Sequence, residues 1–445
     1  MEKYTTKSIL KFAIPSTLGI LLFITPLKCD GQFTVLIAVV ANYLLDIMGE
    51  YSLHFIYCII NISYILTILN KLFCIAFIKK NAKIDELLST KGFWFFIRSV
   101  AFVVVNMIFW KIGPEFIIGH HTGGLVAHSL MPILVCVFLL AALLLPLLLN
   151  FGLLDFFGAL LIKIMRPVFN LPGRSALDCV ASWLGDGSIG VLLTSKQYES
   201  GYYSKREATV IATTFSAVSI TFCLVVISEV ALEHMFLPFY FTVSVAGIIA
   251  AIIVPKLPPL SKIPDTYCKK QDISEEIPQG YTTFSYGLKL GIDKAKNAPN
   301  LKNFLKEGLL NVIEMWLGVL PIILGLGTIT LIIAEYTPIL QILGLPFIPI
   351  YNILGIPEAN LASQTVIIGF ADMFLPSVIA SSIESELTRF VVAATSVSQL
   401  IYMSEIGSII MGSKIPVSLK SLFIIFLQRT LVTLPVIAIL ARIFF

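Results

Sequence analysis

Residues 171–199 read LPGRSALDCVASWLGDGSIGVLLTSKQYE, and residues 356–384 read IPEANLASQTVIIGFADMFLPSVIASSIE. Both stretches are apolar enough to enter a membrane. Each nevertheless contains Gly, Pro and carboxylates at positions where a spanning helix would carry apolar side chains. Interrupted backbone at membrane depth is tolerated only where it is buried in protein or lines a cavity. The two stretches therefore predict a membrane protein built around two broken or re-entrant segments.

The rest of the chain has the composition of a multi-pass membrane protein. Of its 445 residues, 57% are hydrophobic and 13% are charged, whereas a soluble domain carries about a quarter charged residues. Because one spanning helix needs ~20 mostly apolar residues, we expect about 10 transmembrane helices and an all-α integral membrane fold within a lipid bilayer. The apolar stretches fall near 8–27, 33–49, 53–78, 93–112, 125–150, 204–232, 236–254, 304–334, 387–412 and 418–444.

Lysine placement predicts the orientation in the membrane. The formal charge of +4 comes mainly from lysines between apolar stretches, including eight between Lys256 and Lys302. This pattern is typical of cytoplasmic loops rather than of a nucleic-acid-binding surface. Counting spans back from these loops puts the basic N-terminus outside, which the same rule disfavours, so the topology of the first 100 residues stays open. No small-residue cleavage site follows the first apolar run, which favours a retained helix.

The second half of the chain repeats the order of elements in the first half. Each half contains a long span, a short amphipathic piece (Leu153–Phe169 or Ile339–Leu354), a broken segment and two further spans. An offset of 186 positions places Asp372 on Asp186. If each broken segment enters and leaves on one side, the second copy is inverted relative to the first. Inverted repeats with broken helices that meet at the midplane are a recurring plan of transporters.

The stretch from Leu171 to Thr221 also carries a family resemblance. Its motifs PGRSALD, SWLGDGSIG, TSKQYE and FSAVSIT resemble the nucleoside-recognition Gate region of YjiH-like bacterial inner-membrane proteins. The resemblance implies a multi-pass protein of the bacterial cytoplasmic membrane, related in architecture to concentrative nucleoside transporters. It also extends to the membrane parts of ferrous-iron transport and spore-maturation proteins, and it leaves the solute open.

These observations predict four parts of the chain. They are N-terminal membrane helices over 1–124, a first Gate-like repeat unit over 125–254, a cytoplasmic linker over 255–302 and a second Gate-like unit over 303–445. Within the linker, Pro278–Lys296 could form a short interfacial helix.

Carboxylates in the broken segments are the first candidate binding groups. Asp178, Ser182 and Asp186 are spaced by four residues and share a broad helix face. A carboxylate at bilayer depth costs ~2.5–3.5 kcal/mol even on lenient scales, so Asp178, Asp186 and Asp372 indicate a cavity, a paired cation or a proton. The alternative is that they tie down a tight turn, with Arg174 paired to Asp178.

Hydroxyl and amide side chains form a second candidate set. Serines and threonines recur on one face of the span after each broken segment, and two glutamines lie nearby. Such hydroxyls could face a solute or could simply bond their own backbone and join helices. The candidates are Thr213, Ser216, Gln364, Thr395, Ser398 and Gln399.

Two further acids are candidates for coupling transport to protons or sodium. Glu314 lies inside the span 304–334, and Glu405 continues the hydroxyl face of Thr395 and Ser398. An intramembrane carboxylate is what a proton or sodium relay requires. Alternatively, Glu314 lies only two or three turns deep and pairs with a lysine.

Other functional classes lack their signatures. The sequence has no Walker phosphate loop, GxSxG or HExxH, and His120, His121 and His128 have no further ligand at metal spacing. We therefore expect no catalytic residues, cofactor or metal. The leading hypothesis is a secondary transporter of a small polar solute, alone or with a partner subunit or as a homo-oligomer. The alternative is a non-transporting Gate-domain scaffold or regulator that binds a nucleoside-like ligand; a membrane-embedded enzyme would need a constellation that the sequence lacks.

Overall fold

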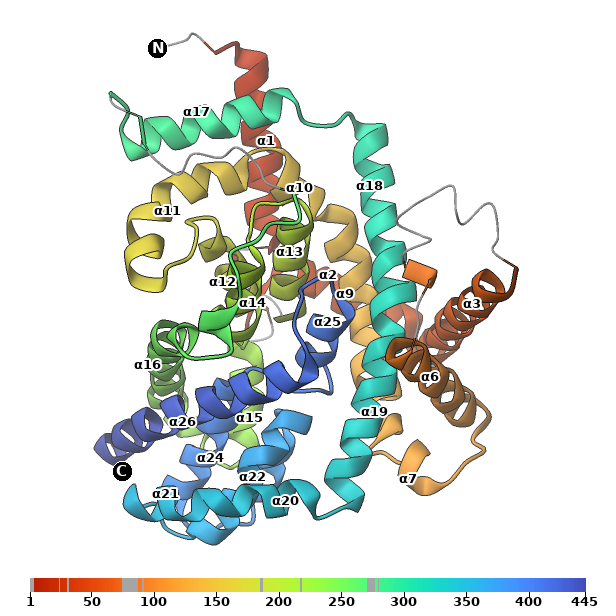
Figure 1. The fold of residues 1–445 in the computed structure, drawn as a ribbon, viewed down its shortest axis with the longest axis vertical. Helices are drawn as coiled ribbons and strands as arrows, with labels where there is room; N and C mark the ends of the chain where they lie inside the picture. The colour runs from red at the N-terminus through yellow and green to blue at the C-terminus, as the bar shows by residue number, and fades with distance from the viewer. Residues whose placement is uncertain are drawn as a thin grey trace.

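The computed structural model describes residues 4–23, 25–29, 32–73, 87–89, 92–184, 187–216, 218–269, 277–278 and 280–445. Helices dominate this part of the chain (Figure 1). Among the described residues, seven helices are long and apolar enough to cross a membrane. The predicted all-helical, multi-pass membrane fold is confirmed, with two departures: the described part of the chain holds seven such helices where about ten were expected, and it contains a short hairpin. A two-stranded antiparallel hairpin, β1 (Pro26–Cys29) and β2 (Gln32–Val35), follows the first helix.

The N-terminal helices end at different residues from the predicted spans. Helix α1 (Thr6–Phe23) stops where the hairpin begins, and α2 (Leu36–Met48) continues from the hairpin. Gly49, with a φ of 44°, then turns the chain toward α3 (Ser52–Phe73) through a short 3-10 turn. Glycine suits this position because it has no Cβ to clash at positive φ. Helix α3 packs on α6 (Phe93–Trp110), and Figure 1 places this pair at one side of the molecule.

The chain from residue 115 to 253, which holds the predicted first repeat unit, begins with a long helical stretch, continues through interrupted helices and ends with a continuous helix. The predicted span over 204–232 is not continuous, because the chain is not helical at Ser216, Val218 and Ser219. The elements in order are α7 (Glu115–Ile118), α8 (Gly123–Leu125), η2 (Val126–Leu130), α9 (Met131–Leu144), α10 (Pro146–Asn150), α11 (Leu153–Phe169), α12 (Ser175–Leu184), α13 (Gly187–Glu199), α14 (Lys205–Val210), η3 (Ile211–Phe215), α15 (Ile220–Glu229), η4 (Glu233–Met235) and α16 (Phe236–Ile253).

The second unit has the same order of elements. The predicted span over 387–412 is again interrupted, here by the loop Leu400–Glu405. The elements are α18 (Leu301–Glu314), η7 (Met315–Val319), α19 (Leu320–Tyr336), α20 (Ile339–Gly344), η8 (Leu345–Phe347), α21 (Ile348–Ile353), α22 (Ala359–Ala371), α23 (Leu375–Ala380), α24 (Glu386–Gln399), α25 (Ile406–Gly412) and α26 (Leu419–Phe444).

The two units point to opposite ends of the molecule. Helix α11 lies near the top of Figure 1, whereas its counterparts α20 and α21 lie near the bottom. The short helix predicted within the linker is observed as α17 (Thr283–Lys296), which packs on α11 and α1. Opposite placement of equivalent pieces is what an inverted arrangement of the two units requires.

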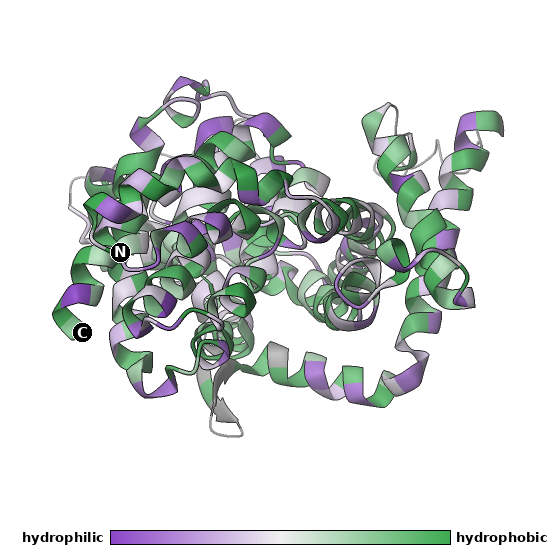
Figure 2. Cartoon of the chain, turned by 90° about the horizontal axis from the view of Figure 1, so that it is seen from below, coloured by the Kyte–Doolittle hydropathy of each residue, from purple (hydrophilic) through white to green (hydrophobic). Residues whose placement is uncertain are grey.

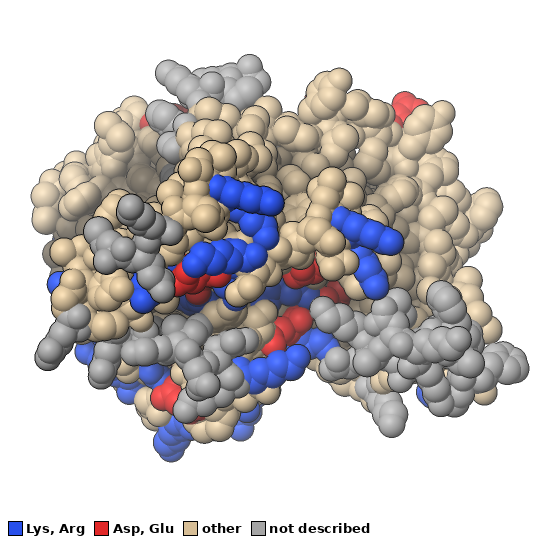
Figure 3. Space-filling view, turned by 90° about the horizontal axis from the view of Figure 1, so that it is seen from above, with Lys and Arg blue, Asp and Glu red and all other residues tan. Residues whose placement is uncertain are grey.

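Apolar surface and charged surface are separated. Figure 2 shows hydrophobic residues along most helices, and several large ones face outward, such as Leu237 on α16 and Ile353 on α21. Figure 3 shows Lys and Arg side chains gathered at the end that carries α17. Apolar side chains meet acyl chains at low cost, and basic side chains favour the cytoplasmic side of a membrane. The α17 end is therefore the expected cytoplasmic face.

Candidate functional site

Parts of four interrupted helices surround a small cavity of about 50 Å³. The α12–α13 pair contributes Ser182 and Gly187, and the break before α15 contributes Ser216 and Ser219. The second unit contributes Met373, which lies between α22 and α23, and the loop before α25. That loop supplies Tyr402 and Glu405. Segments far apart in sequence thus meet where their helical hydrogen bonding stops.

The break before α15 begins at a π-helical turn. Segment η3 ends at Ser216, whose ψ of 163° is extended, and Ser219 then caps α15 by accepting from the Phe222 amide at 3.3 Å. The buried Ser216 hydroxyl has no hydrogen-bond partner among the described residues. π-helical turns occur often at functional sites because they free backbone groups from the regular ladder. Ser216 is therefore the predicted hydroxyl best placed to meet a solute.

The break before α25 is held against the end of α22. Leu400 has a φ of 61°, and the amides of Met403 and Ser404 donate to the carbonyls of Phe370 and Ala371 at 2.8 and 2.9 Å. Ser404 Oγ donates to Asp372 Oδ2 at 2.7 Å. These bonds replace the helical ladder that the loop lacks.

Asp372 has both carboxylate oxygens occupied by protein donors. Beyond its bond with Ser404, its Oδ1 accepts from the amides of Phe374 and Leu375 at 2.8 and 3.1 Å. Side-chain acceptors in this position satisfy the free amides at a helix start. The geometry of Asp372 matches the alternative in which the acid ties down a tight turn.

Asp178 is buried more deeply and bonded less fully. Its Oδ2 accepts from Thr194 Oγ1 at 2.8 Å, and the buried Tyr203 hydroxyl lies beside the carboxylate, but no donor among the described residues lies within 3.5 Å of Oδ1 in hydrogen-bond geometry. Arg174 pairs with Asp155 at 2.7 Å and also donates to Gln197, so its expected ion pair with Asp178 is not observed. Asp178 lies one helical turn before Ser182, which lines the cavity. Asp186 lies outside the described residues.

Several predicted polar residues bond within the protein. Thr213 donates to the Thr209 carbonyl at 2.6 Å, and Ser398 donates to the Ala394 carbonyl at 2.7 Å. Gln399 donates to the Val366 carbonyl and to Thr430. Each of these contacts fits the alternative in which such side chains bond their own backbone or join helices.

Thr395 and Gln364 are two further predicted polar residues. The Thr395 hydroxyl is buried without a partner among the described residues. Gln364 is half-buried on α22, where its backbone lies against Gly344 of α20, and it does not line the cavity.

The two predicted coupling acids lie in different places. Glu314 forms an ion pair with Lys196 of α13, as the lysine alternative anticipated, and Lys196 also contacts Glu199 at 3.4 Å. Glu405 lines the cavity and accepts from the Tyr402 hydroxyl at 3.4 Å. Among the described residues that line this cavity, Glu405 is the carboxylate and no Lys or Arg is present. The described lining is therefore acidic rather than basic.

Sequence reasoning missed Arg429 on α26. This arginine is buried, and it donates from Nε and Nη2 to the Ser398 carbonyl and from Nη1 to the Thr214 carbonyl, at 2.8–3.1 Å. It thereby joins the ends of α24 and η3, one from each unit. A charged residue within the apolar stretch 418–444 was the available signal, because such residues are rare in spanning helices unless they have a role.

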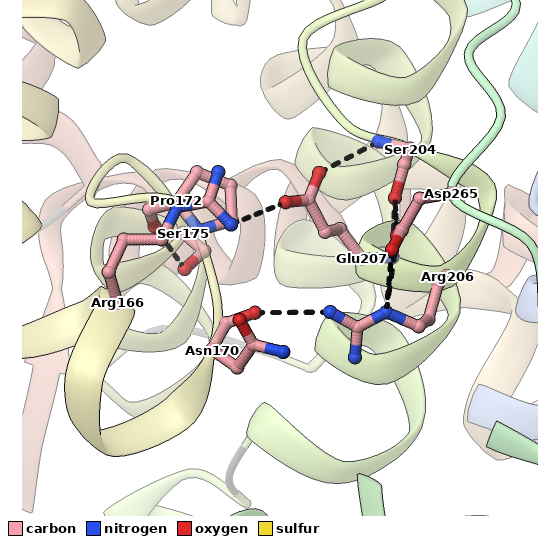
Figure 4. Close-up of polar contacts among 8 residues, drawn as sticks. All are labelled: Arg166, Asn170, Pro172, Ser175, Ser204, Arg206, Glu207 and Asp265. Atoms are coloured by element: carbon pink, nitrogen blue, oxygen red, sulfur yellow. Dashed lines mark hydrogen bonds and ion pairs between the residues drawn. The ribbon is translucent and has the colours of Figure 1, made fainter. Parts of the chain in front are cut away.

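The motif PGRSALD has a structural role in the fold. Gly173 packs so closely on α11 that a Cβ there would lie 2.0 Å from the Gly158 carbonyl oxygen. Figure 4 shows Ser175 bonded to the Pro172 carbonyl and, nearby, Arg166 paired with Glu207 at 2.8 Å. These contacts fix where α12 begins relative to α11 and α14.

Comparisons with known proteins agree with this description. The family model described as "Gate: Nucleoside recognition" matches residues 131–233, which run from α9 to η4 and include the motifs quoted above. This confirms the predicted Gate resemblance for that region. A double variant of the transporter CNTnw in an outward-facing state is 12% identical, with 98% of each chain covered and a TM-score of 0.35. That score is too low to support an inference about a shared fold.

A full-length relative is much closer in sequence. An uncharacterized protein of Alkalihalophilus pseudofirmus is 49% identical over 446 residues, a comparison that covers 100% of this chain and 96% of the relative. Such identity over the whole length leaves no room for a different fold. The chain is thus a multi-pass membrane protein with a nucleoside-recognition Gate region, and it belongs to the same family as this Alkalihalophilus protein.

Proposed function

We propose that this protein is a secondary transporter that moves a small polar solute across the bacterial cytoplasmic membrane. The observation that carries the proposal is the cavity at which the interrupted helices of both units meet. Interrupted helices expose backbone amides and carbonyls that can coordinate a solute and its coupling ion. The proposal assigns the two Gate-like units to 125–254 and 303–445, joined by the linker.

The lining indicates the class of solute. Ser182, Ser216 and Ser219 offer hydroxyls, Glu405 offers a negative charge, and the remaining described lining is largely apolar. An uncharged or zwitterionic solute with hydroxyl or amino groups fits this lining, so we propose a nucleoside or an amino-acid-like molecule. Asp178, Asp186, Thr213, Gln364, Asp372, Thr395, Ser398 and Gln399 complete the proposed site or support it.

Transport requires the cavity to open. Its volume of about 50 Å³ is well below the ~300–1,000 Å³ that ligand pockets usually occupy. The breaks before α15 and α25 are the natural hinges, because each lacks the helical ladder that would resist bending. Protons or sodium ions drive the cycle in this proposal, with Glu405 at the cavity and Glu314 at the edge of the unit as the coupling acids.

Uptake into proteoliposomes tests the proposal. Nucleosides and amino acids are first screened by thermal shift, because a ligand that binds only the folded state raises the unfolding temperature. Vesicles are then loaded under a proton or sodium gradient, and the solutes that gave a shift are tested for uptake. We expect uptake that depends on one gradient and falls at least tenfold in Ser216→Ala and Glu405→Gln. Unaltered uptake by both Asp186→Asn and Asp372→Asn would remove the proposed site.

A Gate-domain scaffold or regulator is the second candidate, favoured by the small, closed form of the cavity. It predicts that a nucleoside-like ligand raises the unfolding temperature while vesicles accumulate none of it under any gradient. A partner membrane subunit or a homo-oligomer is compatible with both candidates.

A further inference from the structure

A groove beside α16 extends away from the proposed transport site, with which it shares Ser216. Two cavities lie along it, one of about 190 Å³ and one of about 400 Å³. Phe169, at the end of α11, lines both. The two cavities are therefore neighbours that meet at this ring.

Both cavities lie along α16 and the short 3-10 turn η5 (Val254–Lys256) that follows it. Tyr240, Ser244, Gly247 and Ala251 line the first cavity, and Ile252, Pro255 and Lys256 line the second. Steps of three and four residues keep Tyr240, Ser244, Gly247, Ala251 and Pro255 on one stripe, with Ile252 and Lys256 next to it. From Tyr240 to Lys256 the stripe is about 24 Å long at 1.5 Å per residue.

The first cavity is apolar and open to the outside of the protein. Trp183, Phe215 and Tyr240 supply aromatic walls. A Cβ added at Gly247 would meet no heavy atom within 4 Å, and the neighbouring Ile248 is 52% exposed. Arg429 also lines this cavity, but each of its three nitrogens already donates to a backbone carbonyl. The cavity therefore suits an apolar chain.

The second cavity is polar and carries positive charge. Arg206 donates to Asp265 at 3.1 Å and to the Asn170 carbonyl at 3.4 Å, which leaves its second terminal nitrogen outside these contacts (Figure 4). Lys256 is exposed and has no ion-pair partner among the described residues. Two cations thus face one carboxylate at the end of the groove nearest the expected cytoplasmic face.

We propose that this groove binds one anionic phospholipid, with an acyl chain in the first cavity and the phosphate near Arg206 and Lys256. One leaflet offers about 15 Å of hydrocarbon and about 5–7 Å of head group, which is close to the length of the stripe. Basic residues next to the membrane attract the anionic lipids of the cytoplasmic leaflet. Ser216 lines both the first cavity and the transport cavity, so the bound chain would contact the break before α15.

Native mass spectrometry of the whole detergent-purified protein tests this proposal without any transport assay. The protein is incubated with phosphatidylglycerol or phosphatidylcholine of identical acyl chains. We expect the wild type to retain phosphatidylglycerol preferentially. Lys256→Gln should lower that preference on the order of fivefold, the effect of one lysine near an anionic surface. Gly247→Trp should lower retention of both lipids, because the indole fills the apolar cavity.

Control variants distinguish lipid binding in this groove from a general effect of charge or of substitution. Lys302→Gln removes the same charge from α18 and should leave the preference unchanged, and Gly247→Ala should bind as the wild type does. If Gly247→Trp does not fold, Ser244→Phe fills the same cavity. Equal retention of both lipids, equal effects of Lys256→Gln and Lys302→Gln, or full retention in the filled variants would overturn the proposal. Protection from thermal unfolding by glycerol phosphate alone would assign the cations to a free phosphoester instead.

Discussion

The two broken segments occupy equivalent places in their units but are fastened differently. The first, α12–α13, is tied by charged pairs to helices outside it, through Arg174 to Asp155 of α11 and through Lys196 to Glu314 of α18. The second, α22–α23, is tied by Asp372 to its own amides and to Ser404. All of the described ties of Asp372 stay within its own unit, whereas Lys196 joins the first unit to the second.

This difference indicates which contacts must change if the units move. The segment α22–α23 can travel with the loop before α25, because their hydrogen bonds move together. Movement of α12–α13 relative to α18 must instead break the Lys196–Glu314 pair. A buried ion pair adds little net stability compared with apolar packing, yet it is costly to leave half-made. We therefore expect the Lys196–Glu314 pair to be either fully formed or fully broken, rather than stretched between these two states.

The largest expected effect is loss of the Asp372 ties. Asp372→Ala leaves two amides and the Ser404 hydroxyl without their acceptor, and we expect it to lower the free energy of unfolding by about 2–4 kcal/mol. Unfolding in detergent measures this change. Asp293→Ala, which breaks an exposed ion pair with Lys296, is the control and should cost less than about 1 kcal/mol. Equal costs for the two variants would show that Asp372 does not fasten its segment.

The tie between the units should matter less. Lys196→Met leaves Glu314 without the cation it pairs with, and we expect a loss of about 1–3 kcal/mol. Adding Glu314→Gln should restore part of that loss, because the uncompensated charge is removed. If the double variant loses the sum of the two single losses in the free energy of unfolding, the two side chains do not interact.

Two glycines, one closely packed and one in open space, should differ by a smaller amount in the stability cost of adding a Cβ. A Cβ at Gly369 of α22 would lie 2.0 Å from Gln399 Oε1, while a Cβ at Gly247 would meet nothing within 4 Å. Gly369→Ala should therefore cost about 1–2 kcal/mol, because the Gln399 amide must shift. Gly247→Ala should be neutral or stabilise by up to about 1 kcal/mol, since alanine favours helices. Equal unfolding temperatures for the two variants would contradict this packing of Gln399.

The fold class was readable from the sequence because hydropathy reports burial in lipid. The broken segments were readable for a related reason: Gly, Pro and Asp are costly in a spanning helix and so mark its interruption. The break before α25 was not readable. Its residues LIYMSE differ little in hydropathy from a helix, and its cause is long-range bonding of Met403 and Ser404 to the end of α22.

The site was predicted less completely than the fold. Spacing placed Ser182, Ser216 and Glu405 each on a candidate face of its own segment, and the structure brings the three to one cavity. Spacing could not show whether a polar side chain is already bonded, which depends on neighbours distant in sequence. Asp178 and Asp372 looked alike in the sequence, yet only Asp372 has donors for both of its oxygens among the described residues. Arg429 was overlooked because its partners are backbone carbonyls, which carry no sequence signal.

The smallest expected change in stability separates these two acids most clearly. Asp178→Asn keeps an oxygen to accept from Thr194 and removes a charge that is 1% exposed, so the free energy of unfolding should change by less than about 1 kcal/mol. Asp372→Asn must instead place an amide NH₂ against the Phe374 and Leu375 amides or against Ser404, and should cost more. Under the proposed function, Asp178→Asn nevertheless lowers uptake at least tenfold, because a neutral amide binds a donor group of the solute more weakly than a carboxylate does. Thr194→Val, which removes the hydroxyl bonded to Asp178 but keeps the charge, should retain more uptake. Wild-type uptake by Asp178→Asn, with Asp372→Asn the more damaging variant, would make both acids structural and remove them from the proposed solute site.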